Sequence, residues 1–358
     1  MHIEMFSAID FTHSLLMNAI KERASDIHLE PQSKDFRIRF RLDGVLYETQ
    51  KLTRYEGQSV INHLKILAQL DIAEHRMPQD GHFSFEADPY KECRLSSCPS
   101  IYGEKLVIRL LENASNLVGL EHLGFEPKAL DQFRQALNKP QGLILVTGPT
   151  GSGKTLTLYH ALSLLNQSTR HIISIEDPVE IKLPGITQVN VHHKIGLDFA
   201  HALRSFLRQD PDVIMVGEIR DLETAEMVIK AAQTGHLVLS TLHTNNAIAS
   251  IARLINIGIA PYTIADTLKL VVAQRLLRKL CLSCQGLSCD ECKEGYQGRI
   301  GAYEVLEIKA DLKEAISHKK PLEDIAFQQG FHSLEQAARL KLQQGITNQE
   351  EILRVIHS

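Results

Sequence analysis

The sequence predicts an α/β protein in which a helix-covered parallel sheet follows a smaller α+β region and precedes a helical C-terminal segment. Three observations support this class. From residue 126 onward, short apolar stretches alternate with stretches of helical spacing, as in βαβ units. Residues 36–42 instead alternate strictly between apolar and charged side chains, which is typical of a half-buried antiparallel strand. Residues 321–330 and 333–344 have helical spacing.

Length and composition fit an ordinary globular protein. The chain has 358 residues, 44% of them apolar and 23% charged, which is enough for two or three domains with their own cores. The formal net charge of −4 creates no general attraction for nucleic acid, so no direct nucleic-acid partner is expected. No stretch approaches the ~18 apolar residues of a membrane-spanning helix, and the N-terminus has no secretory signal pattern. We therefore expect a cytoplasmic protein.

Residues 1–111 predict a small α+β domain. Its expected elements are a helix at residues 9–20, a hairpin at 36–47, a helix at 55–70 and strands at 82–86, 92–97 and 105–111. The dipeptide Asp43-Gly44 favours a tight turn in the hairpin. The polar stretch at residues 112–125 is interpreted as a linker to the next domain.

Several arginines share one face of this small domain. Because the apolar residues of strand 36–42 face a core, Arg37, Arg39 and Arg41 lie on the opposite face. Arg109 belongs to the last predicted strand of the domain. Two interpretations of these side chains remain open: a solvated sheet face, or contacts to a phosphate group bound by a neighbouring subunit.

Residues 126–280 predict the parallel-sheet domain. Apolar strands are expected at residues 143–147, 171–175, 212–216 and 236–241, with helices at residues 156–165, 197–209 and 221–234. The last of these helices begins at Asp221, a favourable N-cap, and is followed by Gly235. In such sheets, ligands bind at the carboxyl ends of the strands.

The first strand of this domain leads into a phosphate-binding loop. The loop matches G-x-x-x-x-G-K-[ST] at every position and consists of Gly148, Pro149, Thr150, Gly151, Ser152, Gly153, Lys154 and Thr155. Its glycines let backbone N–H groups turn toward a triphosphate, and the start of the next helix adds a positive dipole. Lys154 is expected to reach the β- and γ-phosphates, and the Thr155 hydroxyl is expected to bind Mg²⁺. The loop therefore predicts a nucleoside triphosphate site.

Two glutamates follow apolar strands at the same sheet edge. Glu176 ends one strand, and Glu218 follows another, where Gly217 replaces the aspartate that often helps to hold Mg²⁺. We expect Glu218 to polarise the attacking water and Glu176 to lie near Mg²⁺ or near this water. Asp177 precedes a proline and either shapes the turn or contributes to the site.

Three further side chains are candidates for the same site. His243 follows the strand at residues 236–241 and is expected to sense the γ-phosphate. Arg204 and Arg208 lie one turn apart on the helix at residues 197–209, so they share a face. They form either surface ion pairs or charge-stabilising contacts to a phosphate.

A cysteine cluster follows the parallel-sheet domain, at residues 281–292. The pattern C-x₂-C-x₄-C-x₂-C is formed by Cys281, Cys284, Cys289 and Cys292. Four thiolates at these spacings can surround a structural Zn²⁺, and reactive or unpaired thiols are the alternative. Arg278 beside the cluster is interpreted as solvated or as part of a docking patch, and Cys93 and Cys98 as small buried thiols. Residues 293–358 are expected to be mostly helical, and the last 50 residues of the chain are expected to carry no catalytic groups.

Taken together, these motifs resemble those of the secretion ATPases that power type II secretion and type IV pili. In the order of that family, the chain carries a Walker A loop, an Asp box, an atypical Walker B segment and a His box, at residues 148–155, 175–180, 217–221 and 234–245. The resemblance extends to residues 25–28, 39–44 and 273–276, and so covers most of the chain.

This resemblance implies a RecA-like P-loop NTPase core preceded by a PAS-like domain, assembled as a homohexamer that hydrolyses ATP with Mg²⁺ between subunits. Arg39, Arg41 and Arg109 of one subunit would contact the nucleotide of its neighbour. The family acts on a polytopic inner-membrane platform protein and, through it, on pilins. A location at the inner face of the cell membrane follows from this resemblance.

The chain is most similar to the short ComG-type competence ATPases, because it begins almost directly with the domain that contains Ser25-Asp26-Ile27-His28. That likeness implies a pseudopilus for DNA uptake. Type II secretion and type IV pilus assembly or retraction are alternatives, although the cysteine cluster resembles assembly ATPases more than retraction ATPases. A regulatory nucleotide-binding scaffold with little turnover is a further alternative, which the intact Lys154, Glu176 and Glu218 disfavour.

Overall fold

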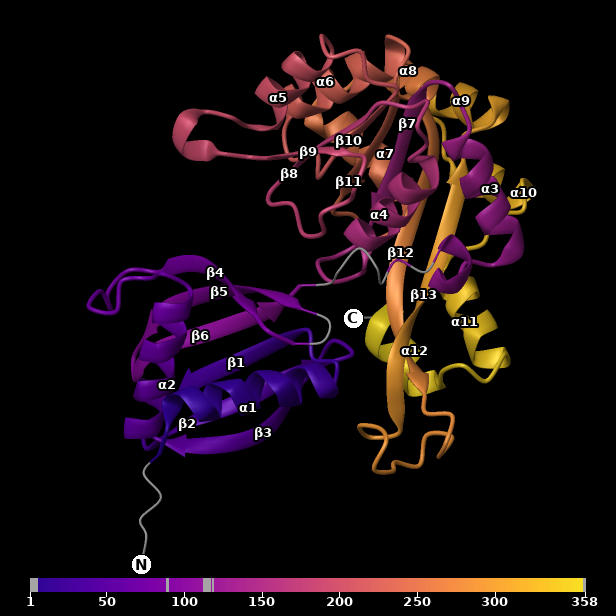
Figure 1. Cartoon of the computed structure of the whole chain (residues 1–358). Helices are drawn as coiled ribbons and strands as arrows, with labels where there is room; N and C mark the ends of the chain where they lie inside the picture. The colour runs from indigo at the N-terminus through magenta and orange to yellow at the C-terminus, as the bar shows by residue number, and fades with distance from the viewer. Residues whose placement is uncertain (1–5, 88–89, 112–116, 118, 357–358) are drawn as a thin grey trace, which may run out of the picture. The chain divides into compact units, whose positions relative to one another are not determined.

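The chain forms two compact units, residues 1–113 and 114–358, each with its own hydrophobic core (Figure 1). The computed structural model describes residues 6–87, 90–111, 117 and 119–356. Strands and helices alternate along the second unit, which confirms the predicted α/β class. No helix among these described residues is long and apolar enough to cross a membrane.

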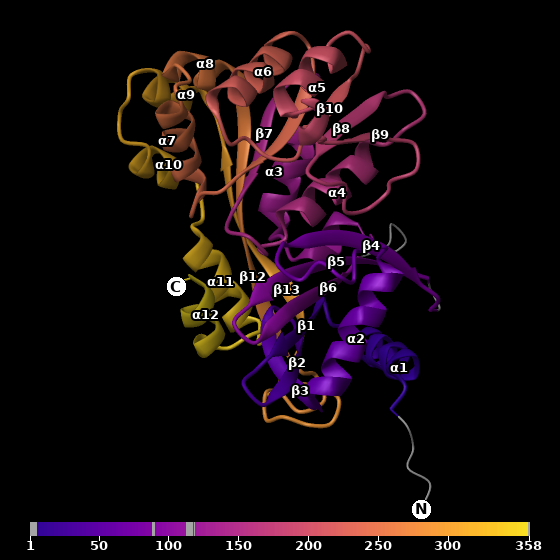
Figure 2. The same cartoon turned by 90° about the vertical axis from the view of Figure 1, so that its left-hand side faces the viewer.

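The first unit is a six-stranded antiparallel sheet with two helices on one face. Its strands are β1 (Asp26–Pro31), β2 (Asp35–Leu42), β3 (Val45–Thr53), β4 (Gln79–Phe85), β5 (Lys91–Ser100) and β6 (Gly103–Leu110), in the order β3-β2-β1-β6-β5-β4. Helices α1 (Ala8–Lys21) and α2 (Arg54–Leu67) lie side by side on this face (Figure 2). They bury Leu16 and Ile61 against the sheet, so the other sheet face carries the polar side chains.

Local sequence explains the β2–β3 hairpin, which was predicted from the alternation of its side chains. Asp43 and Gly44 have φ angles of 49° and 90°, the left-handed values that a tight hairpin turn needs. The alternation of side chains along β5 shows that one of the two cysteines predicted to be buried is exposed. Cys93 points into the core, but Cys98 lies five residues along β5 and is therefore on the exposed face.

The second unit contains a seven-stranded sheet covered by helices on both faces. Its strands are β7 (Gly142–Thr147), β8 (Ile172–Glu176), β9 (Thr187–Asn190), β10 (Val213–Val216), β11 (Leu237–Leu242), β12 (Leu268–Leu280) and β13 (Tyr296–Glu307), in the order β13-β12-β7-β11-β10-β8-β9. All neighbours are parallel except β12 and β13. Alternate side chains of β7 enter two cores, Leu143 and Leu145 on one face and Ile144 and Val146 on the other.

The helices of the second unit divide between these two cores. Those packed with Ile144 and Val146 are α3 (Pro127–Leu137) and α4 (Lys154–Leu165). The opposite face is covered by α5 (Phe199–Phe206), α6 (Leu222–Gln233), α7 (Ala247–Ile257), α8 (Pro261–Thr267), α9 (Ala310–Ser317) and α10 (Glu323–Gln328). Two further helices, α11 (Leu334–Gln343) and α12 (Gln349–Ile356), pack along the β12–β13 hairpin (Figure 1).

Two predicted boundaries differ from the structure. The sheet does not end near residue 280. Strand β13 lies within the segment expected to be mostly helical, and it pairs with β12 along nearly its whole length. In the predicted linker at residues 112–125, residues 112–116 and 118 lie outside the described residues. Leu120 and Phe125 are buried in the core of the second unit, so the end of this segment belongs to that unit.

Candidate functional site

The carboxyl ends of four parallel strands bring the predicted site residues of the second unit to one edge of the sheet. Strand β7 ends at the P-loop, and its neighbour β11 ends one residue before His243. The next strand, β10, ends two residues before Glu218, and β8 ends at Glu176. Because these strands are adjacent and parallel, residues up to 95 positions apart share this edge.

The P-loop connects β7 to α4 with backbone angles that require glycine. Gly148, Gly151 and Gly153 have φ angles of 152°, 80° and 86°. A side chain at Gly148 would also meet the carbonyl oxygen of Gln274 at 2.6 Å, so β12 packs directly against the loop. The loop ends at the first turn of α4, whose N–H groups are available to an anion.

Lys154 folds back over the P-loop. Its Nζ donates to the carbonyl oxygens of Gly148 at 2.9 Å and Pro149 at 3.0 Å. Burial lowers the pKa of Lys154 to about 8, although the charge of Glu218 opposes this shift. The ammonium is therefore poorly compensated by protein groups, and a phosphate at the loop would provide the missing negative charge. Thr155 is half-buried in the first turn of α4.

Glu218 is held between two basic side chains. Its Oε2 lies 3.3 Å from Nε2 of His243, and its Oε1 accepts a hydrogen bond from Arg220. Burial alone would raise the pKa of Glu218, but Arg220 and His243 outweigh burial and hold this pKa below its usual value. Burial, together with the charge of Lys154, lowers the pKa of His243. At neutral pH the pair is thus a carboxylate and an uncharged imidazole.

Glu176 lies in the interior, with 2% of its surface exposed. Its Oε2 accepts a hydrogen bond from the Tyr159 hydroxyl, and its Oε1 accepts one from Ser174 at 2.6 Å and one from Gln188 at 3.2 Å. Burial raises the pKa of Glu176, and these hydrogen bonds oppose the increase. The sequence predicted Glu176 near Mg²⁺ or water. In this structure its carboxylate is bound by the hydroxyl of Tyr159, which belongs to α4.

The two candidate arginines are exposed, but only Arg204 lies on α5. The helix ends at Phe206 and not at residue 209, so Arg208 lies in the turn that follows and the two do not share a helix face as predicted. Arg204 pairs with Glu223 of α6, and Arg208 donates to the carbonyl oxygen of Arg204 at 2.8 Å. Among the described residues, neither makes a hydrogen bond or ion pair with the P-loop, Glu176 or Glu218. Asp177 instead faces Arg220, at 3.9 Å, and His193, at 3.5 Å.

The arginines of the first unit form two groups on the sheet face opposite its helices. Arg41 and Arg109 flank Asp26 in register, at 3.5 and 3.0 Å. Glu30 accepts hydrogen bonds from Arg39 at 2.8 Å and is also contacted by Arg37 and Lys105. Burial alone would raise the pKa of Glu30, but Arg39 and Lys105 lower it to about 2. Two carboxylates are thus contacted by five cations, Asp26 by Arg41 and Arg109, and Glu30 by Arg37, Arg39 and Lys105.

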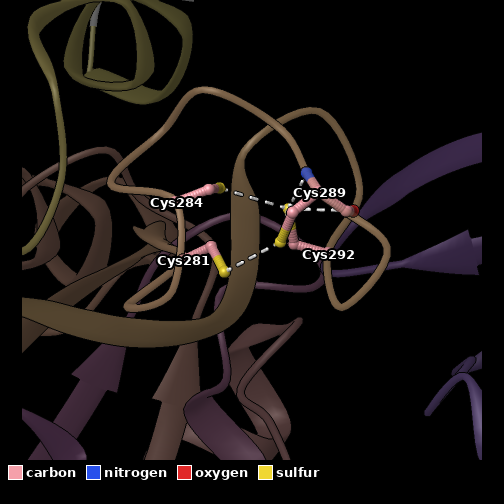
Figure 3. A group of neighbouring side chains, drawn as sticks. All are labelled: Cys281, Cys284, Cys289 and Cys292. Carbon is pink, nitrogen blue, oxygen red and sulfur yellow. Dashed lines mark hydrogen bonds between the residues drawn. The ribbon is translucent and has the colours of Figure 1, made fainter.

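The four clustered cysteines lie in the loop between β12 and β13 and point toward one another (Figure 3). The sulfur of Cys289 lies 3.8 Å from that of Cys281 and 3.7 Å from that of Cys292, which is also 3.7 Å from Cys284. Tetrahedral ligands at Zn–S distances of ~2.3 Å would place the sulfurs about 3.8 Å apart, so the donor set fits zinc.

Arg278, interpreted as solvated or as a docking charge, is buried beside the cluster. Its Nε donates to Glu351 of α12 at 2.9 Å, and its guanidinium lies 3.9 Å from the centre of the Tyr296 ring. The prediction of a solvated charge was wrong, because the carboxylate that neutralises Arg278 lies 73 residues away in the chain.

Sequence reasoning gave no role to three residues that shape the site. Tyr159 looked like a core position of a helix, yet its hydroxyl contacts Glu176. Arg220 lies two residues after Glu218, and Gln274 accepts a hydrogen bond from Thr157 of α4 at 2.8 Å. Only the position of Arg220 next to a candidate carboxylate was a usable signal.

Comparison with known proteins identifies a protein family and several relatives that match the chain. A family model described as type II/IV secretion system protein matches residues 4–354. Two curated relatives named type IV pilus assembly ATPase PilB, from Acinetobacter baylyi and Pseudomonas aeruginosa, are each 45% identical over 97% of the chain. The chain spans 66% and 67% of the length of these two relatives.

A solved structure resembles the chain over nearly its whole length. The pilus retraction motor PilT, solved with bound ADP, is 30% identical, with a TM-score of 0.69 and coverage of 96% of both chains. The RecA-like arrangement expected for residues 126–280 is therefore confirmed as the fold of this part of the chain.

Proposed function

The chain belongs to the type II/IV secretion system protein family, and from this premise we propose that it is a Mg²⁺-dependent ATPase that powers assembly of a type IV-like pilus or pseudopilus. The observation that carries the proposal is the meeting of a P-loop with the Glu218–His243 pair at one sheet edge. The two relatives that are 45% identical are named pilus assembly ATPases, which supports pilus assembly and not retraction.

In the proposed reaction, the P-loop N–H groups and Lys154 bind the phosphates of ATP. Lys154 must leave the carbonyl oxygens of Gly148 and Pro149, and its buried charge favours this exchange. Mg²⁺ would supply charge stabilisation at the β- and γ-phosphate oxygens. The Thr155 hydroxyl would hold it, with Glu176 nearby once Glu176 is released from Tyr159.

Glu218 is the group that we assign to the attacking water. It orients the water and accepts its proton while the bond between the γ-phosphorus and the bridging oxygen breaks. His243 is uncharged and donates Nε2–H to Glu218. If this N–H turns to the γ-phosphate when ATP binds, Glu218 becomes free to hold the water.

We further propose that the subunits form a homohexamer in which Arg39, Arg41 and Arg109 contact a neighbour's nucleotide. Asp26 and Glu30 are contacted by five cations, and this local excess of positive charge supports an anionic ligand. Arg204 on α5 and Arg208 in the turn after it are exposed and would stabilise phosphate charge only across a subunit boundary. Rings arise from head-to-tail interfaces of this kind.

We propose a structural Zn²⁺ held by Cys281, Cys284, Cys289 and Cys292, because the sulfur spacing fits. The family resemblance suggests a polytopic inner-membrane platform protein as partner and the inner membrane face as location, with pilins contacted indirectly. Assembly of a competence pseudopilus for DNA uptake is the narrowest form of the proposal and rests on that resemblance alone.

Two measurements test the proposal. Purified protein should release phosphate from ATP only with Mg²⁺, and Lys154→Ala and Glu218→Gln should lower the rate by at least about a hundredfold while the chain stays folded. A wild type that binds ATP but turns it over no faster than Glu218→Gln would favour the regulatory scaffold instead. In cells, loss of the gene should abolish filament growth; longer filaments would indicate retraction, and lost transformation would support competence.

A further inference from the structure

One buried carboxylate joins the starts of two helices that belong to distant parts of the second unit. Glu304 lies on β13 with 3% of its surface exposed. Its Oε1 accepts the N–H of Ala247, the first residue of α7, at 2.6 Å. Its Oε2 accepts the N–H of Leu334, the first residue of α11, at 2.9 Å.

Each oxygen supplies an acceptor that its helix lacks. The N–H groups of a helix's first turn have no partner within the helix, and this end carries partial positive charge. The cap residue Asn246 satisfies Ala249 at 2.7 Å, and the cap residue Ser333 satisfies Gln336 at 3.3 Å. The first N–H of both helices is left to Glu304, so a single carboxylate ties the two ends together.

The α7 end of this link leads directly to the proposed catalytic edge. Residues 243–246 run from His243 into α7, and the backbone N–H of Thr244 donates to Thr147 Oγ1 at 3.0 Å, immediately before the P-loop. Arg275 donates to the carbonyl oxygen of Asn245 at 3.0 Å. This loop is therefore pinned at one end to β7 and at the other end to Glu304.

The α11 end leads into the C-terminal helices. Lys341 of α11 is buried and pairs with Glu126 at 2.6 Å, and α11 packs against α12 and β13. A displacement of α11 would move Leu334 away from Glu304, and the carboxylate could follow only by pulling on Ala247.

We propose that Glu304 is a positioning residue that holds the His243 loop in place against α11, so that α11 controls the placement of His243. The inference rests on the ATPase function proposed above. It gives α11 a role in setting the rate of hydrolysis without contacting the nucleotide, through a carboxylate that accepts hydrogen bonds from two residues 87 positions apart in the chain.

The first test compares Glu304→Gln with Glu351→Gln in the full-length chain. Glu351 is a matched control, because it is also fully buried in this unit and also accepts a backbone N–H, that of Arg278 at 2.9 Å. The amide of Glu304→Gln keeps one acceptor and turns a donor toward the second helix. We expect kcat to fall roughly ten- to a hundredfold with KM for ATP within about twofold, whereas Glu351→Gln lowers the melting temperature and leaves kcat within about twofold.

Hydrogen exchange provides a reading that does not depend on turnover. In Glu304→Gln, amides of residues 243–250 should exchange faster than in the wild type and in Glu351→Gln. If Glu304→Gln does not fold, Ser333→Ala tests the same link by loosening α11. This substitution removes the N-cap of α11 without changing a residue of α7. Faster exchange at residues 247–250 in Ser333→Ala supports the link. An equal loss of kcat in both glutamine variants, or unchanged exchange near α7, overturns the proposed link. A wild-type protein without ATP turnover would contradict only the ATPase proposal.

Discussion

The imidazole Nε2 of His243 lies 3.3 Å from Oε2 of Glu218, although the two residues follow different strands, β11 and β10. The parallel pairing of these strands, with Val216 opposite Ser240, makes the contact possible. The arrangement lets an uncharged histidine orient the carboxylate that we assign to the attacking water, and it places both groups on the same edge as Lys154.

Replacing His243 should slow hydrolysis without preventing nucleotide binding. His243→Ala removes the side chain that contacts Glu218 and whose N–H we propose turns to the γ-phosphate, so we expect kcat to fall roughly ten- to a hundredfold. Because burial and Lys154 lower the pKa of His243, the wild-type kcat should stay level across neutral pH and decline only below the ordinary histidine pKa of about 6.5. A pH–rate profile with matched titration of bound nucleotide checks both points, and an activity loss centred above pH 7 would contradict the neutral-histidine assignment.

Lys154 should make the stability of the protein depend on pH in the absence of nucleotide. Its pKa is lowered to about 8 in the folded chain, while an unfolded lysine has a pKa of about 10.5. Between these values the unfolded state binds more protons, so the free energy of unfolding should rise with pH. In Lys154→Met this rise should be smaller by roughly 1–2 kcal/mol between pH 8 and pH 10.

Nucleotide provides the control for this prediction. The phosphate charge should restore the protonated form of Lys154, so saturating ADP should flatten the rise in stability over the same pH range. Denaturant unfolding of the wild type and Lys154→Met at several pH values measures the difference. Parallel pH profiles for the two proteins without nucleotide would show that Lys154 is not the titrating group.

Removing the Tyr159 hydroxyl should change the ionisation of Glu176. Tyr159→Phe deletes a donor that lowers the pKa of Glu176, so this pKa should rise and the acid limb of the kcat profile should move to higher pH. The hydroxyl also accepts the N–H groups of Glu180 at 3.0 Å and Ile181 at 3.3 Å, so stability should fall by about 1–3 kcal/mol. Tyr303→Phe, which removes another buried hydroxyl, should leave the acid limb in place; a shift in both variants would contradict the assignment.

The parts of the site that could be predicted are those carried by local pattern. The P-loop motif and the rule that parallel strands end together placed Lys154, Glu218 and His243 on one edge. The pairing of β12 with β13 was missed, because charged residues interrupt the apolar run of β12 and nothing local indicates a partner strand. The role of Tyr159 was missed for a similar reason, since a buried tyrosine in a helix looks like core until its hydroxyl partner is known.

Metal removal should loosen the β12–β13 loop and spare the nucleotide site. Purified protein should contain about one zinc per chain, and Cys292→Ser should lose it, because a three-thiolate site binds more weakly. Since the cluster follows Arg278 in the chain and Arg278 is paired with Glu351 of α12, the melting temperature of the second unit should fall while the Kd for ADP changes less than about twofold. Cys98→Ser, at an exposed thiol of the first unit, is the control and should keep the metal.

Mixing two inactive variants should restore hydrolysis if the arginines of the first unit act on a neighbouring subunit. Arg109 is 57% exposed and paired only with Asp26 among the described residues, so it is free to contact a second chain. Lys154→Ala disables the nucleotide site of its own chain, whereas Arg109→Ala disables that of its neighbour. In rings assembled from equal amounts of both, about a quarter of the interfaces combine an intact Lys154 with an intact Arg109.

We therefore expect the mixture to recover up to about a quarter of wild-type turnover, since each restored interface is a complete site. Lys154→Ala mixed with Glu218→Gln is the matched control. Both of those residues lie in the second unit of the same chain, so no arrangement of the two variants rebuilds a site. Mass measurement of the mixed assemblies must show that subunits exchange. If mixed rings form and the Arg109→Ala combination stays as inactive as the control, Arg109 does not act between subunits and its ion pair with Asp26 is structural.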